Sequence, residues 1–300
     1  VTLNGNNPEP GEIATPLLPE AEVYGALITG VRDYVDKNGF PGVLLGLSGG
    51  IDSALTLAVA VDALGADRVR AVMMPSQYTA GMSVEDARAE ATALGVRYVE
   101  IPIKPMFDAF LKALEGEFKG LPADATEENL QSRIRGTLLM ALSNKTGAMV
   151  LTTGNKSEMG TGYATLYGDM AGGVAVLKDI NKTLVYKLAN YRNTLSRVIP
   201  KRVIERPPWA EVKPGQTEQD SLAPYPVLDA IMEAYVEGDI SPREIATQGF
   251  RIEDVKRVVQ LVRASEYKRR QAPVGIRITP RGFGKDWRFP ITNRFRHRFD

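Results

Sequence analysis

The sequence contains no cysteine and a single histidine, His297, near its C-terminal end. The absence of cysteine excludes disulfides, thiolate nucleophiles, zinc–cysteine sites and sulfur-transfer chemistry. One histidine argues against a Ser–His–Asp triad and against a histidine-rich metal site. Oxygen ligands and phosphate groups therefore remain as the basis for any chemistry of this chain.

An excess of one charge and a long apolar run are also missing. The 37 Lys and Arg residues almost balance the 36 Asp and Glu residues, so no strong field favours nucleic acid or a membrane surface. No apolar run reaches the length of a membrane span, and the start does not resemble a signal peptide. We expect a soluble cytoplasmic protein. Its basic, aromatic C-terminal tail is typical of a segment that is solvated or covers a neighbouring subunit.

The chain is organised around the stretch from Val43 to Gly65, VLLGLSGGIDSALTLAVAVDALG. Its first five residues are almost wholly apolar, which is typical of a strand buried on both faces of a parallel sheet. A turn of small residues follows, and apolar side chains then recur at helical spacing. Glycines let the backbone approach an anion, and the first N–H groups of the helix point at it. This pattern predicts a phosphate cradle.

Asp52 is the unexpected residue in this loop. A carboxylate beside a bound polyphosphate would be repelled unless a divalent cation lay between them, so Asp52 is predicted to be a Mg²⁺ ligand. The loop is not GxxxxGK[ST], because no lysine follows the glycines, and it is not GxGxxG, because the glycines are adjacent. The alternative is a tight turn that joins a core strand to a core helix.

The rest of the pattern predicts an α/β fold in two parts. Residues 1–19 are expected to form an arm or a linker, and residues 20–300 one catalytic domain. Strands at 43–47, 69–74, 97–103 and 148–153 alternate with helices, which predicts a doubly wound, Rossmann-like, mostly parallel sheet, expected to have five strands. A helix is expected at 81–94, with Ser83 as its cap. A small helical section follows towards the C-terminus, with helices expected at 225–237, at 241–248 with Ser241 and Pro242 as cap and first position, and at 252–267. Ligands of such sheets lie beyond the carboxyl ends of the strands.

A second loop, TTGNKSEMGTGYATLYGDMAGG, follows the fourth strand at the same edge of the sheet. It contains Glu158 and Asp169. Glu158 could share a cation with Asp52, since two carboxylates on adjacent strand ends can bridge a Mg²⁺ held mainly by phosphate and water. The alternatives are that Glu158 caps a helix or pairs with Lys156.

Cationic residues offer further phosphate contacts. Lys182 is predicted at the first turn of a helix, where the helix dipole disfavours a cation, so a nearby polyphosphate explains it better; a solvated lysine is the alternative. The helix at 127–145 carries Asn129, Arg133 and Arg135. Arginines can act as planar forks for phosphate, but the spacing alone favours solvated residues.

Several stretches together resemble one family, the NAD⁺ synthetases, members of the ATP pyrophosphatase group. They are LSGGIDSAL, MMPSQYTAGMSVEDA, ENLQSRIRG, TTGNKSEM, GYATLYGDMAGG, KDINKTLVYKLA, PPWAEVKPGQTEQDSLAPY and EYKRRQAPVGIRIT. The similarity begins near Glu20 and continues almost to the end of the chain. Each stretch alone is weak evidence, but their order along the chain is specific.

The resemblance implies an adenine nucleotide alpha hydrolase-like fold and the amidation of deamido-NAD⁺ to NAD⁺ with ATP and ammonia through an acyl-adenylate. It implies Mg²⁺ as the cofactor, held by Asp52 and Glu158, and Asp52 and Lys182 as catalytic residues. The residues that it assigns to ATP are Gly46, Leu47, Ser48, Gly49, Gly50, Ile51, Asp52, Ser53, Thr153 and Lys182. Those that it assigns to deamido-NAD⁺ are Asn129, Arg133, Tyr163, Asp169 and Lys268.

Two departures from the family pattern qualify the resemblance. Trp209 stands where a Ser or Thr usually contacts ATP, so that contact is lost or replaced. Leu166 stands where the short ammonia-dependent branch has a lysine, and TLYGDMAGG is more similar to the glutamine-dependent branch. That branch carries a glutaminase with a nucleophilic cysteine, so the chain is expected to be a synthetase half without its glutaminase domain or an ammonia-using relative.

Partners and competing functions follow from the same resemblance. It implies a homodimer, to which the apolar faces of the helices at 24–35 and 127–142 could contribute. One alternative is another ATP-dependent amidoligase with the same loop. Another is a nucleotide-binding module without chemistry, which would have no need of a metal ligand at Asp52.

Overall fold

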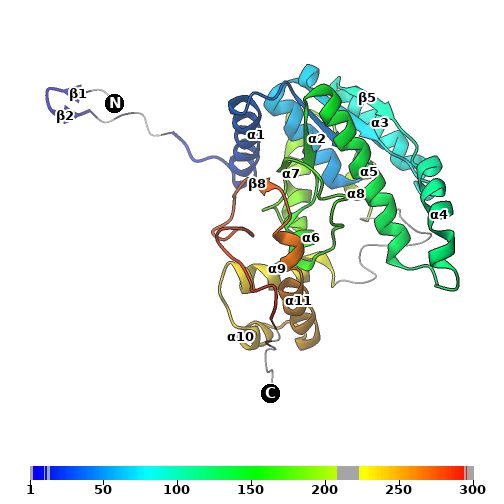
Figure 1. The fold of residues 1–300 in the computed structure, drawn as a ribbon. Helices are drawn as coiled ribbons and strands as arrows, with labels where there is room; N and C mark the ends of the chain where they lie inside the picture. The colour runs from blue at the N-terminus through cyan, green and yellow to red at the C-terminus, as the bar shows by residue number, and fades with distance from the viewer. Residues whose placement is uncertain (1–2, 10, 12–13, 208–222, 294, 296–300) are drawn as a thin grey trace.

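The computed structural model describes residues 3–9, 11, 14–207, 223–293 and 295. At its centre is a sheet of six parallel strands in the order β5–β4–β3–β6–β7–β8. Figure 1 labels its two edge strands, β5 and β8. These strands are β3 (Val43–Gly46), β4 (Val69–Met73), β5 (Arg97–Glu100), β6 (Met149–Thr152), β7 (Val174–Ala175) and β8 (Val274–Gly275). The predicted parallel sheet is confirmed. The predicted count of five strands is wrong, because β7 and β8 have two residues each and show no periodic pattern.

The order of the strands places a switch point between β3 and β6. Val43 of β3 pairs with Val69 of β4 on one side and with Met149 of β6 on the other. The chain therefore leaves β3 towards one edge of the sheet and later returns to build the other half. Segments that follow β3 and β6 diverge at such a point and leave a crevice beyond their carboxyl ends.

Helices cover both faces of the sheet, because strand side chains alternate between two apolar cores. Val43 and Leu45 belong to one core and Leu44 to the other. The first core is covered by α1 (Pro19–Lys37), α2 (Ile51–Leu64), α3 (Gly81–Leu94), α7 (Lys182–Leu195) and α8 (Lys201–Glu205). The second is covered by α4 (Lys104–Phe118) and α5 (Ala125–Thr146), and η1 (Ala66–Arg68) connects α2 to β4.

Two expectations about helices on this body are corrected. α3 begins after Ala80 and has no side-chain cap, so Ser83 lies inside the helix and does not cap it. The apolar stripe of α1, including Leu27, Val31 and Val35, is fully buried in the first core. That stripe cannot also be a dimer surface, because apolar area already removed from water is not available for a second contact.

The predicted C-terminal helical section forms a third core beside the sheet. This core is built by α6 (Lys156–Thr161), α9 (Tyr225–Val236), α10 (Pro242–Thr247) and α11 (Ile252–Ala264), and α12 (Glu266–Arg269) lies against α6 and α11. Ser241 caps α10 through a capping box and Pro242 occupies its first turn, as predicted. The single helix predicted over 252–267 is divided at Ser265 into α11 and α12.

The two ends of the chain differ in their contacts. β1 (Leu3–Asn4) and β2 (Asn7–Pro8) form a small hairpin that extends away from the body (Figure 1). In the tail, Trp287 and Phe289 pack against Tyr235 of α9, with ring centroids 5.5 and 6.3 Å away. Aromatic residues of the tail thus belong to the third core.

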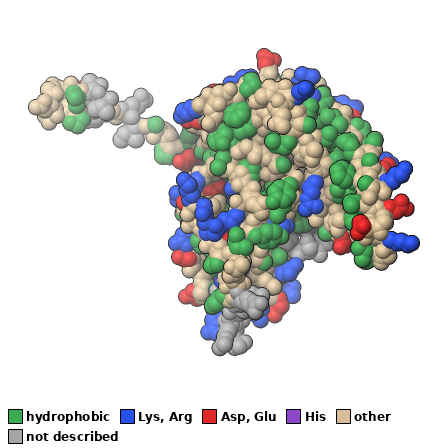
Figure 2. Space-filling view, in the orientation of Figure 1, with side chains coloured by type: hydrophobic (Ala, Val, Ile, Leu, Met, Phe, Trp, Pro, Cys, Tyr) green, Lys and Arg blue, Asp and Glu red, His purple; other side chains and the backbone are tan. Residues whose placement is uncertain are grey.

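The surface agrees with the balanced composition. On the face drawn in Figure 2, acidic and basic side chains are interspersed and separated by uncharged ones. Within the part of the chain that the structure describes, no helix is both long and apolar enough to cross a membrane.

Candidate functional site

The glycine loop predicted to bind phosphate joins β3 to α2 at the switch point. Gly49 has a φ of +80°, and a Cβ at this position would lie 2.3 Å from the carbonyl oxygen of Ser83. Only glycine fits there, because a side chain would meet both strain and backbone. Gly50 is the N-cap of α2 and makes no side-chain cap hydrogen bond. The N-terminal N–H groups of α2 therefore remain suited to an anion.

Two serines fix the shape of this loop. The Ser53 hydroxyl donates to the carbonyl oxygen of Gly50 at 2.9 Å, and the backbone N–H of Ser48 donates to Ser53 Oγ at 3.2 Å. Ser53 is buried. Its hydroxyl thus ties Ser48, just beyond β3, to the first turn of α2 and fixes the shape of the loop between them.

Asp52 lies in the first turn of α2, and its carboxylate contacts Asn155, the N-cap of α6, and Lys182 of α7. Its Oδ1 accepts a hydrogen bond from Asn155 Nδ2 at 2.9 Å, and its Oδ2 lies 2.6 Å from Lys182 Nζ. About one sixth of the Asp52 side chain is exposed. The carboxylate is thereby fixed at the cleft while solvent can still reach it.

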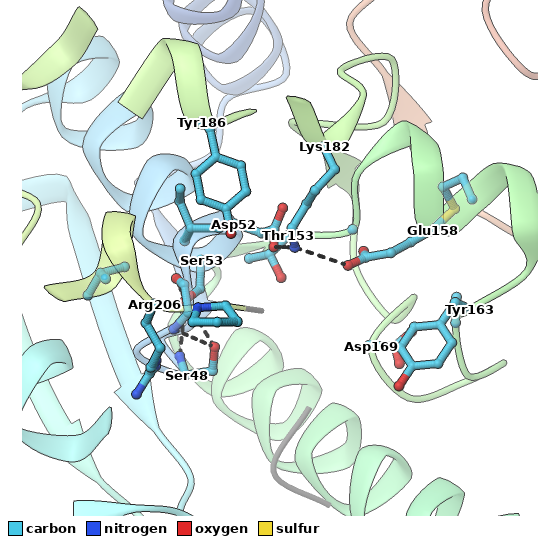
Figure 3. A pocket seen from close by; sticks show the side chains of 17 residues that line it. Ser48, Asp52, Ser53, Thr153, Glu158, Tyr163, Asp169, Lys182, Tyr186 and Arg206 are labelled. Atoms are coloured by element: carbon cyan, nitrogen blue, oxygen red, sulfur yellow. Dashed lines mark hydrogen bonds and ion pairs between the residues drawn. The ribbon is translucent and has the colours of Figure 1, made fainter. Parts of the chain in front are cut away.

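Lys182 is the first residue of α7, as predicted, and its side chain is buried. Its ammonium group lies between Asp52 and Glu158, 3.9 Å from the nearer Glu158 oxygen, and 5.3 Å from the ring centre of Tyr225. Figure 3 shows these three charged groups converging from α2, α6 and α7. The alternative of a solvated lysine is wrong, because this side chain is enclosed by protein.

Glu158 fills one of its predicted roles, that of a helix cap, and does not pair with Lys156. Its Oε2 accepts a hydrogen bond from the backbone N–H of Asn155 at 3.1 Å in a capping box at the start of α6. Its Oε1 faces Lys182. Lys156 instead pairs with Asp179 at 2.8 Å and Glu237 at 2.7 Å. Glu158 is therefore a cap whose second oxygen is turned towards Asp52 and Lys182.

Two adjoining cavities open at this edge of the sheet. The first has a volume of about 230 Å³ and the second about 480 Å³. The first is lined by the predicted residues Ser48, Gly50, Ile51, Asp52, Ser53, Thr153, Glu158, Tyr163, Asp169 and Lys182. The second is lined by the predicted residues Gly46, Leu47, Ser48, Asn129, Thr153, Tyr163, Asp169 and Lys268. Ser48, Thr153, Tyr163, Ala164 and Asp169 line both, so the cavities form one cleft with two chambers.

The far wall of the cleft carries Asp169, Lys268 and Asn129. Asp169 accepts the Thr165 N–H at 2.9 Å, and although solvent reaches it, surrounding protein raises the pKa of its carboxyl. Lys268 donates to the carbonyl oxygens of Gly162 and Ala164, both at 2.7 Å, and desolvation lowers its pKa. Polar groups held in this way are suited to a polar substrate.

Two predicted site residues line neither cavity: Gly49, which shapes the glycine loop from behind, and Arg133. Arg133 lies on the exposed side of α5 and donates to the carbonyl oxygen of Leu166 at 3.2 Å. Trp209 lies outside the described residues.

Sequence reasoning missed several residues that the fold brings to the cleft. Arg206 lines the first cavity and donates to the Gly49 carbonyl at 3.0 Å and to Ser83 Oγ at 3.0 Å. Tyr186 also lines the first cavity and Arg135 the second. No motif marked Arg206, and its position just before a proline pair was the available signal. Arg135 was noted, but spacing alone could not separate it from a solvated residue.

Comparison with known proteins matches this geometry to one family. The profile described as NAD synthase covers residues 23–272. The chain belongs to the NAD synthase family. It is 58% identical over 278 residues to a glutamine-dependent NAD(+) synthetase of Acinetobacter baylyi, a match that covers 92% of this chain and 51% of that protein.

Solved structures of NAD synthases agree. A glutamine-dependent NAD+ synthetase from Acinetobacter baumannii in complex with ADP is 54% identical, with a TM-score of 0.64, covering 94% of this chain and 52% of that one. An NH3-dependent NAD synthetase from Campylobacter jejuni is 26% identical with a TM-score of 0.69, covering 83% of this chain and 96% of that one. The chain spans about half the length of the curated glutamine-dependent relatives that it matches.

The donor set of this NAD synthase site suits a divalent metal that phosphate helps to hold. Within the described residues no cluster of three or more His, Cys, Asp or Glu side chains is placed to hold a metal. Two carboxylates, Asp52 and Glu158, line the same cavity and face the same ammonium group. Mg²⁺ is commonly bound by one or two carboxylates together with substrate phosphates and water, so these two side chains fit that ion.

Proposed function

We propose that this chain amidates deamido-NAD⁺ to NAD⁺ with ATP and ammonia, and releases AMP and pyrophosphate. The observation that carries the proposal is the cluster of Asp52, Glu158 and Lys182 at the mouth of the glycine loop in a member of the NAD synthase family. A loop that only binds a nucleotide has no need of two carboxylates around one lysine.

Pyrophosphate is assigned to the first chamber and the adenosine of ATP to the second. The first contains the start of α2 together with Lys182 and Arg206, which are suited to the β- and γ-phosphates. The second is partly lined by apolar residues at the ends of β3 and β4, which suit a base. The α-phosphorus would then lie where the chambers meet, beside Thr153.

The reaction follows from this placement in two steps. An oxygen of the nicotinate carboxylate attacks the α-phosphorus, and the bond from that phosphorus to the pyrophosphate oxygen breaks. The lone pair of ammonia then attacks the acyl carbon, the carbon–oxygen bond to AMP breaks, and a proton leaves the nitrogen. The protein positions the reactants, and Lys182 and the loop N–H groups stabilise the charge that develops on pyrophosphate.

Mg²⁺ is the proposed metal, with Asp52 and Glu158 as the residues that would hold it. When bound, it would neutralise charge on the pyrophosphate oxygens. Asn155 supports both ligands, since it donates to Asp52 and caps α6 with Glu158. Such neighbouring hydrogen bonds orient metal ligands and tune their affinity.

Deamido-NAD⁺ is assigned to the far wall of the cleft. Asn129, Tyr163, Asp169 and Lys268 line the second chamber, and Tyr163 and Asp169 also line the first. Arg133 could contact a dinucleotide only where the substrate extends beyond this cavity. A second subunit that completed the site would bring such a part of the substrate to Arg133. A homodimer is therefore proposed together with Arg133. The nitrogen source is proposed to be ammonia, supplied free or by a glutaminase part such as the relatives' name implies.

The test is a product assay with ATP, Mg²⁺, deamido-NAD⁺ and either ammonium or glutamine. We expect AMP and NAD⁺ to form in equal amounts with ammonium alone. ADP as the product would contradict transfer at the α-phosphorus. AMP formation that requires a different acid in place of deamido-NAD⁺ would instead support another amidoligase.

A further inference from the structure

Asp229 is a buried carboxylate behind the site, in the C-terminal helical section. It lies on α9, is 3% exposed, and lines neither of the two cavities. Its Oδ1 accepts the hydroxyl of Ser157 at 2.5 Å, and its Oδ2 accepts the backbone N–H of Thr183 at 2.8 Å. One carboxylate thus contacts the first turns of α6 and α7.

A second hydrogen bond connects this contact to Lys182, a member of the cluster of Asp52, Glu158 and Lys182. Ser157 Oγ accepts the backbone N–H of Lys182 at 2.9 Å. The Ser157 hydroxyl therefore donates to Asp229 and accepts from Lys182, which fixes the polarity of the chain. Ser157 is adjacent to Glu158 in α6, and Lys182 begins α7. The positions of Glu158 and Lys182 relative to Asp52 therefore depend on how the first turn of α6 packs against the first turn of α7.

The charge of Asp229 suits this place. The start of α7 directs the Thr183 N–H towards it and the start of α6 presents the Ser157 hydroxyl, so an anion is favoured there. Burial raises the pKa of Asp229, while the hydrogen bonds from Ser157 and Thr183 and the nearby Lys182 charge oppose that rise. An amide could not replace the carboxylate, because both groups that contact it are hydrogen-bond donors. In one orientation the amide NH₂ would face the Thr183 N–H, and in the other it would face the Ser157 hydroxyl, which donates in that direction.

We propose that Asp229 is a positioning residue for the pyrophosphate end of the site. It joins the starts of α6 and α7, so that Glu158 and Lys182 face Asp52 and a bound pyrophosphate together. The C-terminal section thereby sets the geometry of a site whose ligand contacts lie elsewhere. This inference rests on the proposed function for its catalytic consequence, whereas its consequence for pyrophosphate binding is independent of that function.

The test compares Asp229→Asn with Ser157→Ala, which breaks the same chain by removing one hydroxyl. Both variants are expected to lower kcat for AMP formation about 10-fold or more and to leave KM for deamido-NAD⁺ within about twofold, because the far wall of the cleft is untouched. The double variant is expected to lose little more than either single one, since both changes break one chain. Val258→Ala, a truncation in the same core, serves as the control for lost stability.

Binding of Mg²⁺ and inorganic pyrophosphate, measured by calorimetry, supplies the second readout. We expect about 10-fold weaker binding in both variants and wild-type binding in Val258→Ala. If either folded variant binds pyrophosphate as the wild type does, or loses no more kcat than Val258→Ala at equal thermal stability, Asp229 is not a positioning residue. If the wild type makes no AMP from deamido-NAD⁺, the proposed function fails, and the pyrophosphate measurement still decides the role of Asp229.

Discussion

The ammonium group of Lys182 lies 2.6 Å from a carboxylate oxygen of Asp52, although 130 residues separate the two in the chain. Asp52 comes from α2, the helix after β3, and Lys182 from α7, a much later helix packed on the same core. Together with Glu158 they place two carboxylates around one ammonium group. A polyphosphate alone would be repelled by the carboxylates, so the pair favours a phosphate that arrives with a divalent cation.

Asp52→Asn is expected to lower pyrophosphate release about 100-fold or more and to leave the fold intact. The amide keeps the shape of the side chain and can still accept from Asn155, but it loses the charge that faces Lys182 and the cation. Pyrophosphate release and thermal unfolding are the measurements. Asp67→Asn, at an exposed acid between α2 and β4, is the matched control. Normal turnover of Asp52→Asn would show that Asp52 holds no essential metal.

Arg206→Ala is expected to raise KM for ATP about 10-fold and to spare KM for deamido-NAD⁺. The change removes a cation from the first cavity and leaves the Gly49 carbonyl without this donor. Arg206→Lys restores the charge but not the two-pronged contact, so it should recover activity only in part. Arg202→Ala is the control, because Arg202 pairs with Glu85 and Asp86 on α3 and lines neither cavity. Equal effects of Arg206→Ala and Arg202→Ala would remove Arg206 from the site.

Arg133→Ala is expected to raise KM for deamido-NAD⁺ and to leave KM for ATP unchanged. Because Arg133 lies outside the cavities of a single chain, its effect should depend on a second subunit. Steady-state kinetics over a range of protein concentrations, with sedimentation to follow the oligomeric state, measure both. Asn129→Ala, inside the second chamber, should raise the same KM at every concentration. An unchanged KM in Arg133→Ala would exclude Arg133 from substrate binding.

The architecture was predictable where a strand or helix carries its own periodic signal. The apolar run before the glycine loop and the stripe of Leu27, Val31 and Val35 each determine one buried element. β7 and β8 have two residues each, so no period exists to detect. The range 81–94 of α3 is also confirmed, but residue type alone misplaces its cap, because the helix begins after Ala80 and Ser83 lies inside it.

The site was predictable only in its local part. Asp52 and the glycines form one short segment, so the sequence alone indicated a phosphate loop. For Glu158 and Lys182 the residues alone left alternatives open, and only the family resemblance favoured a place in the site. The fold places both in one cavity with Asp52. Arg206 lines the site and Asp229 contacts Ser157 behind it, both from elements far away in the chain, and such tertiary contacts leave no local pattern.

Glu90→Gln is expected to stabilise the protein increasingly as pH rises above the ordinary range of a glutamate. Glu90 on α3 is 1% exposed, and its Oε1 has no hydrogen-bond partner among the residues that the structure describes. Burial raises the pKa of Glu90 well above its usual value, with Arg192 opposing the rise and Asp86 adding to it. The folded state therefore holds a proton that the unfolded state releases, so the free energy of unfolding of the wild type falls as pH rises from the pKa of the unfolded state towards that of the folded state.

Glutamine keeps the shape of the side chain and cannot ionise. The difference in free energy of unfolding between Glu90→Gln and the wild type should therefore grow by about 1.4 kcal/mol per pH unit between these two pKa values. Urea unfolding at pH 5 and pH 7.5 measures it, with the exposed Glu85→Gln on the same helix as control. A pH-independent difference between Glu90→Gln and the wild type would show that Glu90 is ionised in the folded protein.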